Sequence, residues 1–140
     1  MRWTTIAIAL LVACNDVRDF RGAWHGARVG DAEVLHVGAG DAATLSIDRI
    51  DNHGIEARLT VDNLLPETSI TSIAGAEADA VSTMTFAGSP LRVFIAFTPL
   101  SDGGGDATTL IALYDDDRVE VRLLRGGTMP LYAIFTLRSG

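Results

Sequence analysis

Short runs of alternating apolar and polar residues recur from residue 20 onward, and none has a helical period of useful length. Clusters of Gly, Asp, Asn and Pro separate the runs, as turns separate antiparallel strands. We therefore expect an all-β domain, an antiparallel up-and-down meander of about 8–10 strands that forms a small barrel or sandwich. The expected strands cover about 20–29, 33–37, 42–50, 55–61, 68–73, 80–86, 91–99, 107–114, 118–125 and 131–138.

The hairpin that joins the third and fourth expected strands shows the clearest alternation. A four-residue loop over 51–54 would turn Asp48 toward the core. A three-residue loop over 52–54, with its glycine left-handed, instead sets Ile47 opposite Leu59 on the buried face. The alternation therefore favours the three-residue loop.

The first hairpin is expected to turn over residues 30–33 and to pair Val29 with Val34. In this register Trp24 points into the core, while His25 and His36 point outward. Two outward histidines could begin a metal site, but zinc needs three or four ligands. We therefore expect surface histidines and predict neither a metal nor another cofactor.

The composition fits one domain without an internal boundary: 140 residues, a net charge of −7, and arginine as the only basic residue besides histidine. A chain this acidic is not expected to bind nucleic acid, which requires clustered cations. The charge favours solubility more directly than it favours a cationic partner.

The first 14 residues have a different pattern. Arg2 precedes an apolar run from Ile6 to Ala13, which is typical of a secretory signal peptide. The run is shorter than the roughly 20 residues that cross a bilayer. It ends in Leu11-Val12-Ala13-Cys14, which contains the single cysteine of the chain.

This ending resembles the lipobox of bacterial lipoproteins. The resemblance implies a signal peptide over 1–13, a lipidated Cys14 with a tether to residue 19, and a single β domain over 20–140. Membrane lipid is then a partner of the protein through Cys14, and two or three acyl chains would anchor the protein stably. Asn15, where inner-membrane retention usually shows aspartate, implies the outer membrane. The alternatives are an ordinary signal peptide or a buried N-terminal strand.

Acidic turns provide the other candidates for chemistry. Asp102, Asp106 and the run 115–117 carry hard oxygen ligands of the kind calcium prefers. The strand 107–114 separates the two groups by roughly 23 Å, so they cannot share an ion. Gly103-Gly104-Gly105 is expected to be a flexible loop, because no helix follows it to bind phosphate. With no catalytic motif in the sequence, we expect that the protein is not an enzyme.

Gly22 and Trp24 on the first strand, with Arg138 on the last, resemble the lipocalin and calycin superfamily. The resemblance implies that Trp24 and Arg138 pack together at a closed barrel end and that the interior holds a small apolar ligand. The sequence departs from the family pattern, because it lacks a Thr-Asp-Tyr stretch and a helix between the first strands. An ordinary buried tryptophan is the alternative.

Three functions remain open. The first is a membrane-anchored envelope lipoprotein whose β domain binds or scaffolds an envelope protein without catalysis. The second is a lipocalin-like carrier of a small apolar ligand, and the third an unrecognised envelope hydrolase. A ten-strand meander would place both termini at one end, with binding expected opposite them. The loops expected at that opposite end are 30–33, 51–54, 74–80, 101–106 and 126–130, and those expected beside the membrane are 38–41, 62–67, 87–90 and 115–117.

Overall fold

A computed structural model describes residues 16–29, 42–72, 75–76 and 88–140. One turn of 3-10 helix, η1 (Val17–Phe20), leads into the strands. In these ranges the strands are β1 (Gly22–Arg28), β2 (Ala42–Ile50), β3 (Ile55–Val61), β4 (Leu65–Ser72), β5 (Gly75–Ala76), β6 (Arg92–Pro99), β7 (Asp106–Tyr114), β8 (Arg118–Arg125) and β9 (Leu131–Ser139). Cys14, His36 and the expected strands 33–37 and 80–86 lie outside the described residues.

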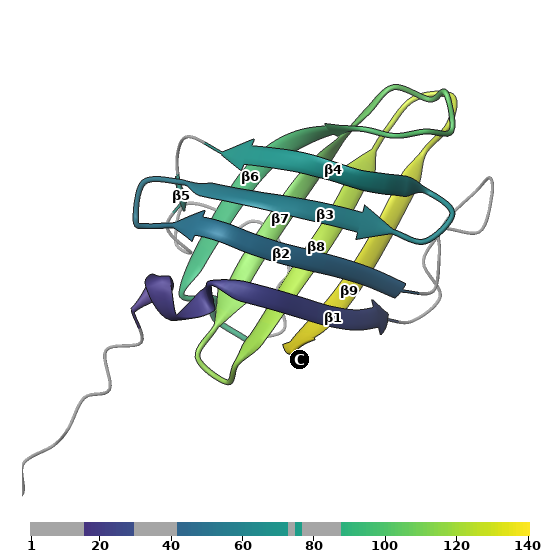
Figure 1. Cartoon of the computed structure of the whole chain (residues 1–140). Helices are drawn as coiled ribbons and strands as arrows, with labels where there is room; N and C mark the ends of the chain where they lie inside the picture. The colour runs from purple at the N-terminus through teal and green to yellow at the C-terminus, as the bar shows by residue number, and fades with distance from the viewer. Residues whose placement is uncertain (1–15, 30–41, 73–74, 77–87) are drawn as a thin grey trace, which may run out of the picture.

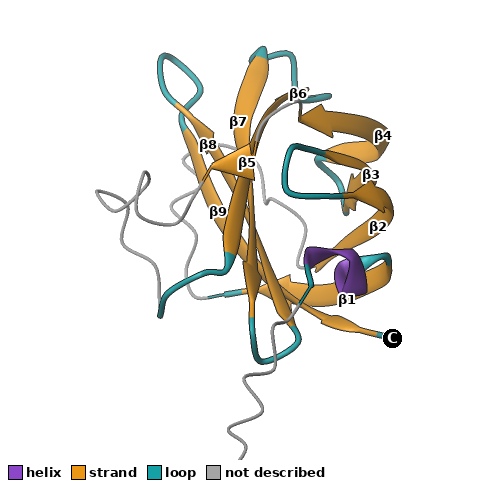
Figure 2. Ribbon diagram, turned by 90° about the vertical axis from the view of Figure 1, so that its left-hand side faces the viewer, coloured by secondary structure: helices purple, strands orange, loops and turns teal. Residues whose placement is uncertain are grey.

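The strands form one antiparallel sheet in the order β4-β3-β2-β1-β9-β8-β7-β6-β5. Neighbours in the sheet are neighbours in the chain except where β1 meets β9. The layer β1–β4 crosses in front of β6–β9 (Figure 1), and the two layers face each other in Figure 2. The sheet is thus an up-and-down meander curled into a nearly closed barrel, which confirms the expected fold class.

The inward positions of both layers are apolar and pack into one core. Trp24 belongs to it with 4% of its surface exposed, whereas His25, next along β1, is exposed. The Trp24 ring stacks on Phe20 at 5.5 Å between centroids, and its Nε1 donates to the Phe20 carbonyl over 2.8 Å. The predicted inward tryptophan and outward His25 are both confirmed.

The expected pairing of β1 with residues 33–37 is wrong. Ala27 already has a partner on each side, Ala42 in β2 and Thr136 in β9. A strand has only two hydrogen-bonding edges, and the returning last strand occupies one of them. Local alternation along β1 carries no information about that distant strand.

The predicted β2–β3 register is also wrong, because the loop has four residues and pairs Ile50 with Ile55. Under strict alternation this loop would bury Asp48. A β-bulge at Asp48 removes the conflict: Ile47 pairs with Ala57, whereas the next pair is Arg49 with Glu56. One extra residue on β2 lets the apolar positions on both sides of it face inward.

β1 begins and β9 ends at the same end of the barrel, which we call the proximal end (Figure 1). The turn 115–117 and the approach to β6 at 88–90 are also proximal, as predicted. Loop 51–54 was expected at the opposite end but is proximal, because β1 and β2 are direct neighbours. The Arg92 Nη2 donor lies 3.4 Å from Asn52 Oδ1, which joins this loop to the start of β6.

The opposite end, which we call the distal end, carries the loops 62–64, 100–105 and 126–130. The last two were expected there, whereas 62–67 was expected beside the membrane. Loops 51–54 and 62–67 thus lie at the ends opposite to those expected, for one reason. The expected strand at 33–37, placed between β1 and β2 in the sheet, would have reversed the direction of β2 and β3. In the described residues, β1 is followed across the sheet by β2.

Candidate binding surface

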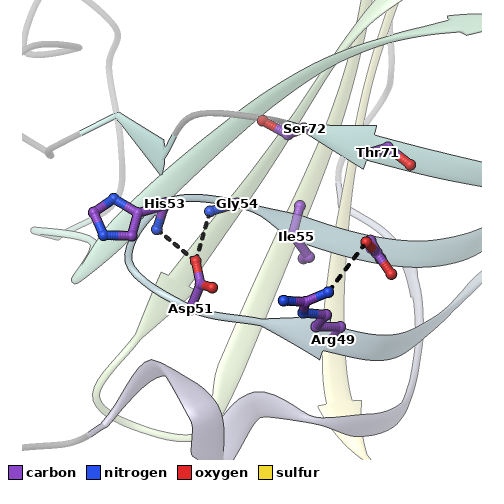
Figure 3. A pocket seen from close by; sticks show the side chains of 8 residues that line it. Arg49, Asp51, His53, Gly54, Ile55, Thr71 and Ser72 are labelled. Carbon is purple, nitrogen blue, oxygen red and sulfur yellow. Dashed lines mark hydrogen bonds and ion pairs between the residues drawn. The ribbon is translucent and has the colours of Figure 1, made fainter.

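Among the described residues, two depressions adjoin loop 51–54 at the proximal end. The first has a volume of about 250 Å³ and lies against the ends of β2, β3 and β4 (Figure 3). The Asp51 carboxylate accepts hydrogen bonds there from the His53 and Gly54 amides, at 2.7 and 3.0 Å. These donors lower the pKa of Asp51. The carboxylate therefore shapes the loop.

The charged side chains Arg49 and Glu56 of this depression are exposed, whereas Ser72 is buried. Arg49 lies 3.9 Å from Glu56, and the two side chains are 73% and 56% exposed. Exposed pairs of this kind contribute little to stability. The residues that line the depression are Arg49, Asp51, His53, Gly54, Ile55, Glu56, Thr71 and Ser72.

The second depression, of about 520 Å³, lies between η1 and loop 51–54. Asp16 begins η1 by accepting from the Arg18 amide, and its carboxylate also binds the Arg18 side chain at 2.7 Å. The side-chain bond from Arg18 is the main cause of the lowered pKa of Asp16. This end of the molecule is thus lined by paired, solvated charges.

The distal end is held together by a buried ion pair, which we call the Arg125 clamp. The Arg125 guanidinium donates to both carboxylate oxygens of Asp102, at 2.8 and 2.6 Å, and its Nε donates to the Met129 carbonyl at 2.7 Å. The side chains of Arg125 and Asp102 are only 7% and 10% exposed. Hydrogen bonding from Arg125 lowers the pKa of Asp102 to about 2.

The clamp fixes two loops. Its paired residues, Asp102 and Arg125, are 23 positions apart in the sequence. Loop 100–105, which was expected to be flexible, is tied through Asp102, and loop 126–130 is tied through Met129. A Cβ atom at Gly104 would lie 2.6 Å from the Arg125 guanidinium carbon, so a larger residue there would have to displace the guanidinium. A guanidinium and a carboxylate in this fork geometry make a strong and directional pair.

A third loop joins the same distal surface. Ser101 donates from its hydroxyl to the Leu64 carbonyl at 2.7 Å, and its amide reaches the same oxygen at 3.3 Å. Asn63, just before Leu64, has φ of 61°, the left-handed conformation that asparagine tolerates. The three loops are therefore held in place before any partner binds.

A row of cross-strand neighbours that holds Phe97, Leu124 and Tyr132, with Thr108 among them, runs across the outer face beside this end. Phe97 pairs with Thr108, Thr108 with Leu124, and Leu124 with Tyr132. Phe97 is 74% exposed and Tyr132 is 38% exposed, and neighbouring Ile95 is 37% exposed. Large aromatic side chains exposed together on an outer face are typical of interaction surfaces.

The outer face of β8 also buries a charged pair. Arg122 donates from Nε to Glu120, and their side chains are 8% and 5% exposed. Near it, the Arg118 guanidinium lies 3.8 Å from the Tyr114 ring centroid, and burial raises the pKa of that phenol. Glu120 is thus held by an arginine within the outer face of β8.

The residues of the lipocalin-like motif do not meet. Trp24 faces the core, whereas Arg138 lies opposite His25 on the outer face and is 57% exposed. Arg138 instead donates to the Asp116 carbonyl at 2.7 Å and so supports the β7–β8 turn. Gly22 adopts φ of 120°, where a side chain would be strained. The expected packing of Trp24 with Arg138 is therefore wrong.

The acidic candidates lie at opposite ends of β7. Asp102 belongs to the Arg125 clamp at the distal end, whereas residues 115–117 form the proximal turn. Across the described ranges, His and acidic side chains do not gather in a group of three that could hold a metal ion. The Arg125 clamp was not found from the sequence, because its partners come from separate loops.

The described part of the chain contains no helix long and apolar enough to cross a bilayer. No family model matches the chain, and no curated protein or solved structure matches it significantly.

Proposed function

We propose that the protein is a lipoprotein of the bacterial envelope, anchored through Cys14 and held preferentially at the outer membrane. The proposal rests first on the lipobox-like Leu11-Val12-Ala13-Cys14. Helix η1 begins at Val17, so the link from Cys14 to the domain is at most about 10 Å long. The proximal end then faces the membrane, and the distal end faces away from it.

We propose further that the β domain acts by binding or scaffolding an envelope protein, without catalysis. The observation that carries this choice is the packed interior. The largest inward side chains, among them Phe94, Leu59 and Phe135, are at most 1% exposed. Side chains that fill the described part of the barrel in this way favour a packed interior over the cavity that a carrier needs.

The binding surface in this proposal is the distal end together with the row Phe97, Leu124 and Tyr132. Its loops are fixed by the Arg125 clamp, so binding would order little additional chain and cost little entropy. The row supplies aromatic area of the kind that dominates protein interfaces. Both features lie on the part of the domain that the anchor leaves accessible.

Two measurements test the anchor and the choice of partner separately. Cells that express Cys14→Ser should release the protein from the membrane fraction, whereas an equally membrane-bound variant would refute the anchor. Purified wild-type protein should not bind a fluorescent fatty acid saturably. Stoichiometric binding that is lost on Phe94→Trp, which adds volume inside the barrel, would favour the carrier.

The surface itself is tested by photo-crosslinking in intact cells. A crosslinking residue at position 97 should trap a discrete protein, and Tyr132→Ser should reduce the yield several-fold. The matched control position is Ser69, which is also exposed but lies on the outer face of β4. Equal products from positions 97 and 69 would contradict the proposed surface.

A further inference from the structure

We draw no further inference here: the strongest candidate, the side-chain cluster on the outer face of β6–β8 formed by Val93, Leu110, Ala112 and Tyr114 beside the buried Glu120–Arg122 pair, carries nothing because the described residues do not show what covers it.

Discussion

Gly26 is the residue that allows the first and last strands to meet. A Cβ atom at this position would lie 1.8 Å from the Thr136 carbonyl oxygen and 2.8 Å from the Leu137 Cα. Both are backbone atoms, which cannot rotate away as a side chain can. The closure of the barrel therefore depends on a glycine in the middle of β1, a position where glycine ordinarily weakens a strand.

We expect Gly26→Ala to destabilise the domain by at least about 3 kcal/mol, because β1 and β9 must separate to admit the methyl group. Gly126→Ala is the matched control, since a Cβ there meets no atom within 4 Å. Its free energy of unfolding should change by less than about 1 kcal/mol. Urea unfolding followed by circular dichroism gives both values, and similar midpoints would show that β1 and β9 are not so close.

Trp24 and His25 are adjacent on β1 but face opposite sides of the sheet. Trp24→Ala should cost about 3–5 kcal/mol, because it removes a large buried side chain and its stacking on Phe20. His25→Ala should change stability by about 0.5 kcal/mol at most, as an exposed substitution. Equal shifts of the urea midpoint would refute the assignment of the two faces.

The Arg125 clamp makes stability depend on pH in the acid range. The pKa of Asp102 in the folded protein, about 2, lies below its ordinary value of 3.8. The ionised carboxylate therefore stabilises the fold above pH 3.8, and this contribution is lost as the pH falls toward 2. Allowing for solvent screening, we expect about 1–2 kcal/mol from this group.

Asp102→Asn should be less stable than wild type at pH 6, and the difference should shrink between pH 4 and pH 2. Arg125→Met should behave similarly, because the Asp102 pKa then loses its main cause of depression. The measurement is the free energy of unfolding in urea at each pH. Wild-type and Asp102→Asn curves that stay parallel down to pH 2 would contradict the clamp.

At the scale of the element, the extra residue in β2 allows a four-residue loop over 51–54 while the apolar residues of β2 stay buried. Leu45 and Ile47 precede the bulge, and Ile50 follows it, yet all three are buried. Strict alternation cannot bury residues 47 and 50 on one face, because they are an odd number of positions apart. The bulge at Asp48 supplies the missing step, and Asp48 itself turns outward to bind Arg58 at 3.0 Å.

Deletion of Asp48 should therefore be far more harmful than its replacement. Without the extra residue, either Ile47 or Ile50 must face water, and we expect a loss above about 3 kcal/mol or failure to fold. Asp48→Ala keeps the chain length and loses only exposed contacts, so it should cost no more than about 1 kcal/mol. Comparable unfolding curves for the two variants would mean that the register does not need the bulge.

At the scale of the whole molecule, the meander returns its last strand to its first, so β1 begins and β9 ends at the proximal end (Figure 1). An anchor at Cys14 then determines which loops are near lipid. With the proposed anchor, loop 51–54 would lie on the lipid side and loop 126–130 on the free side. This arrangement can be tested by thiol labelling in the membrane, because a lipidated Cys14 leaves no other thiol.

Thr128→Cys should react rapidly with a bulky maleimide on membrane vesicles that display the domain outward, since Thr128 is exposed on a distal loop. His53→Cys should react several-fold more slowly, because the membrane shields the proximal end. In detergent the two rates should converge. A faster reaction at position 53 in intact vesicles would place the barrel the other way round.

Local alternation in the sequence was enough to predict the fold class and which of Trp24 and His25 on β1 faces the core. The physical reason is that side chains alternate between the two faces of a strand, so burial of one face requires an apolar residue at every second position of that strand. The lipobox-like segment is equally local, and its role remains a proposal drawn from the sequence alone.

Tertiary structure alone decided the pairing of β1 with β9, the bulge at Asp48, the ends at which loops 51–54 and 62–64 lie, and the Arg125 clamp. Each depends on residues far apart in the chain: β9 returns to β1 after more than one hundred residues, and Arg125 meets Asp102 across 23. A strand edge can hydrogen-bond to any strand that the closed sheet brings beside it, and a charged loop residue can pair with any opposite charge that is brought near. No period within one strand specifies that partner.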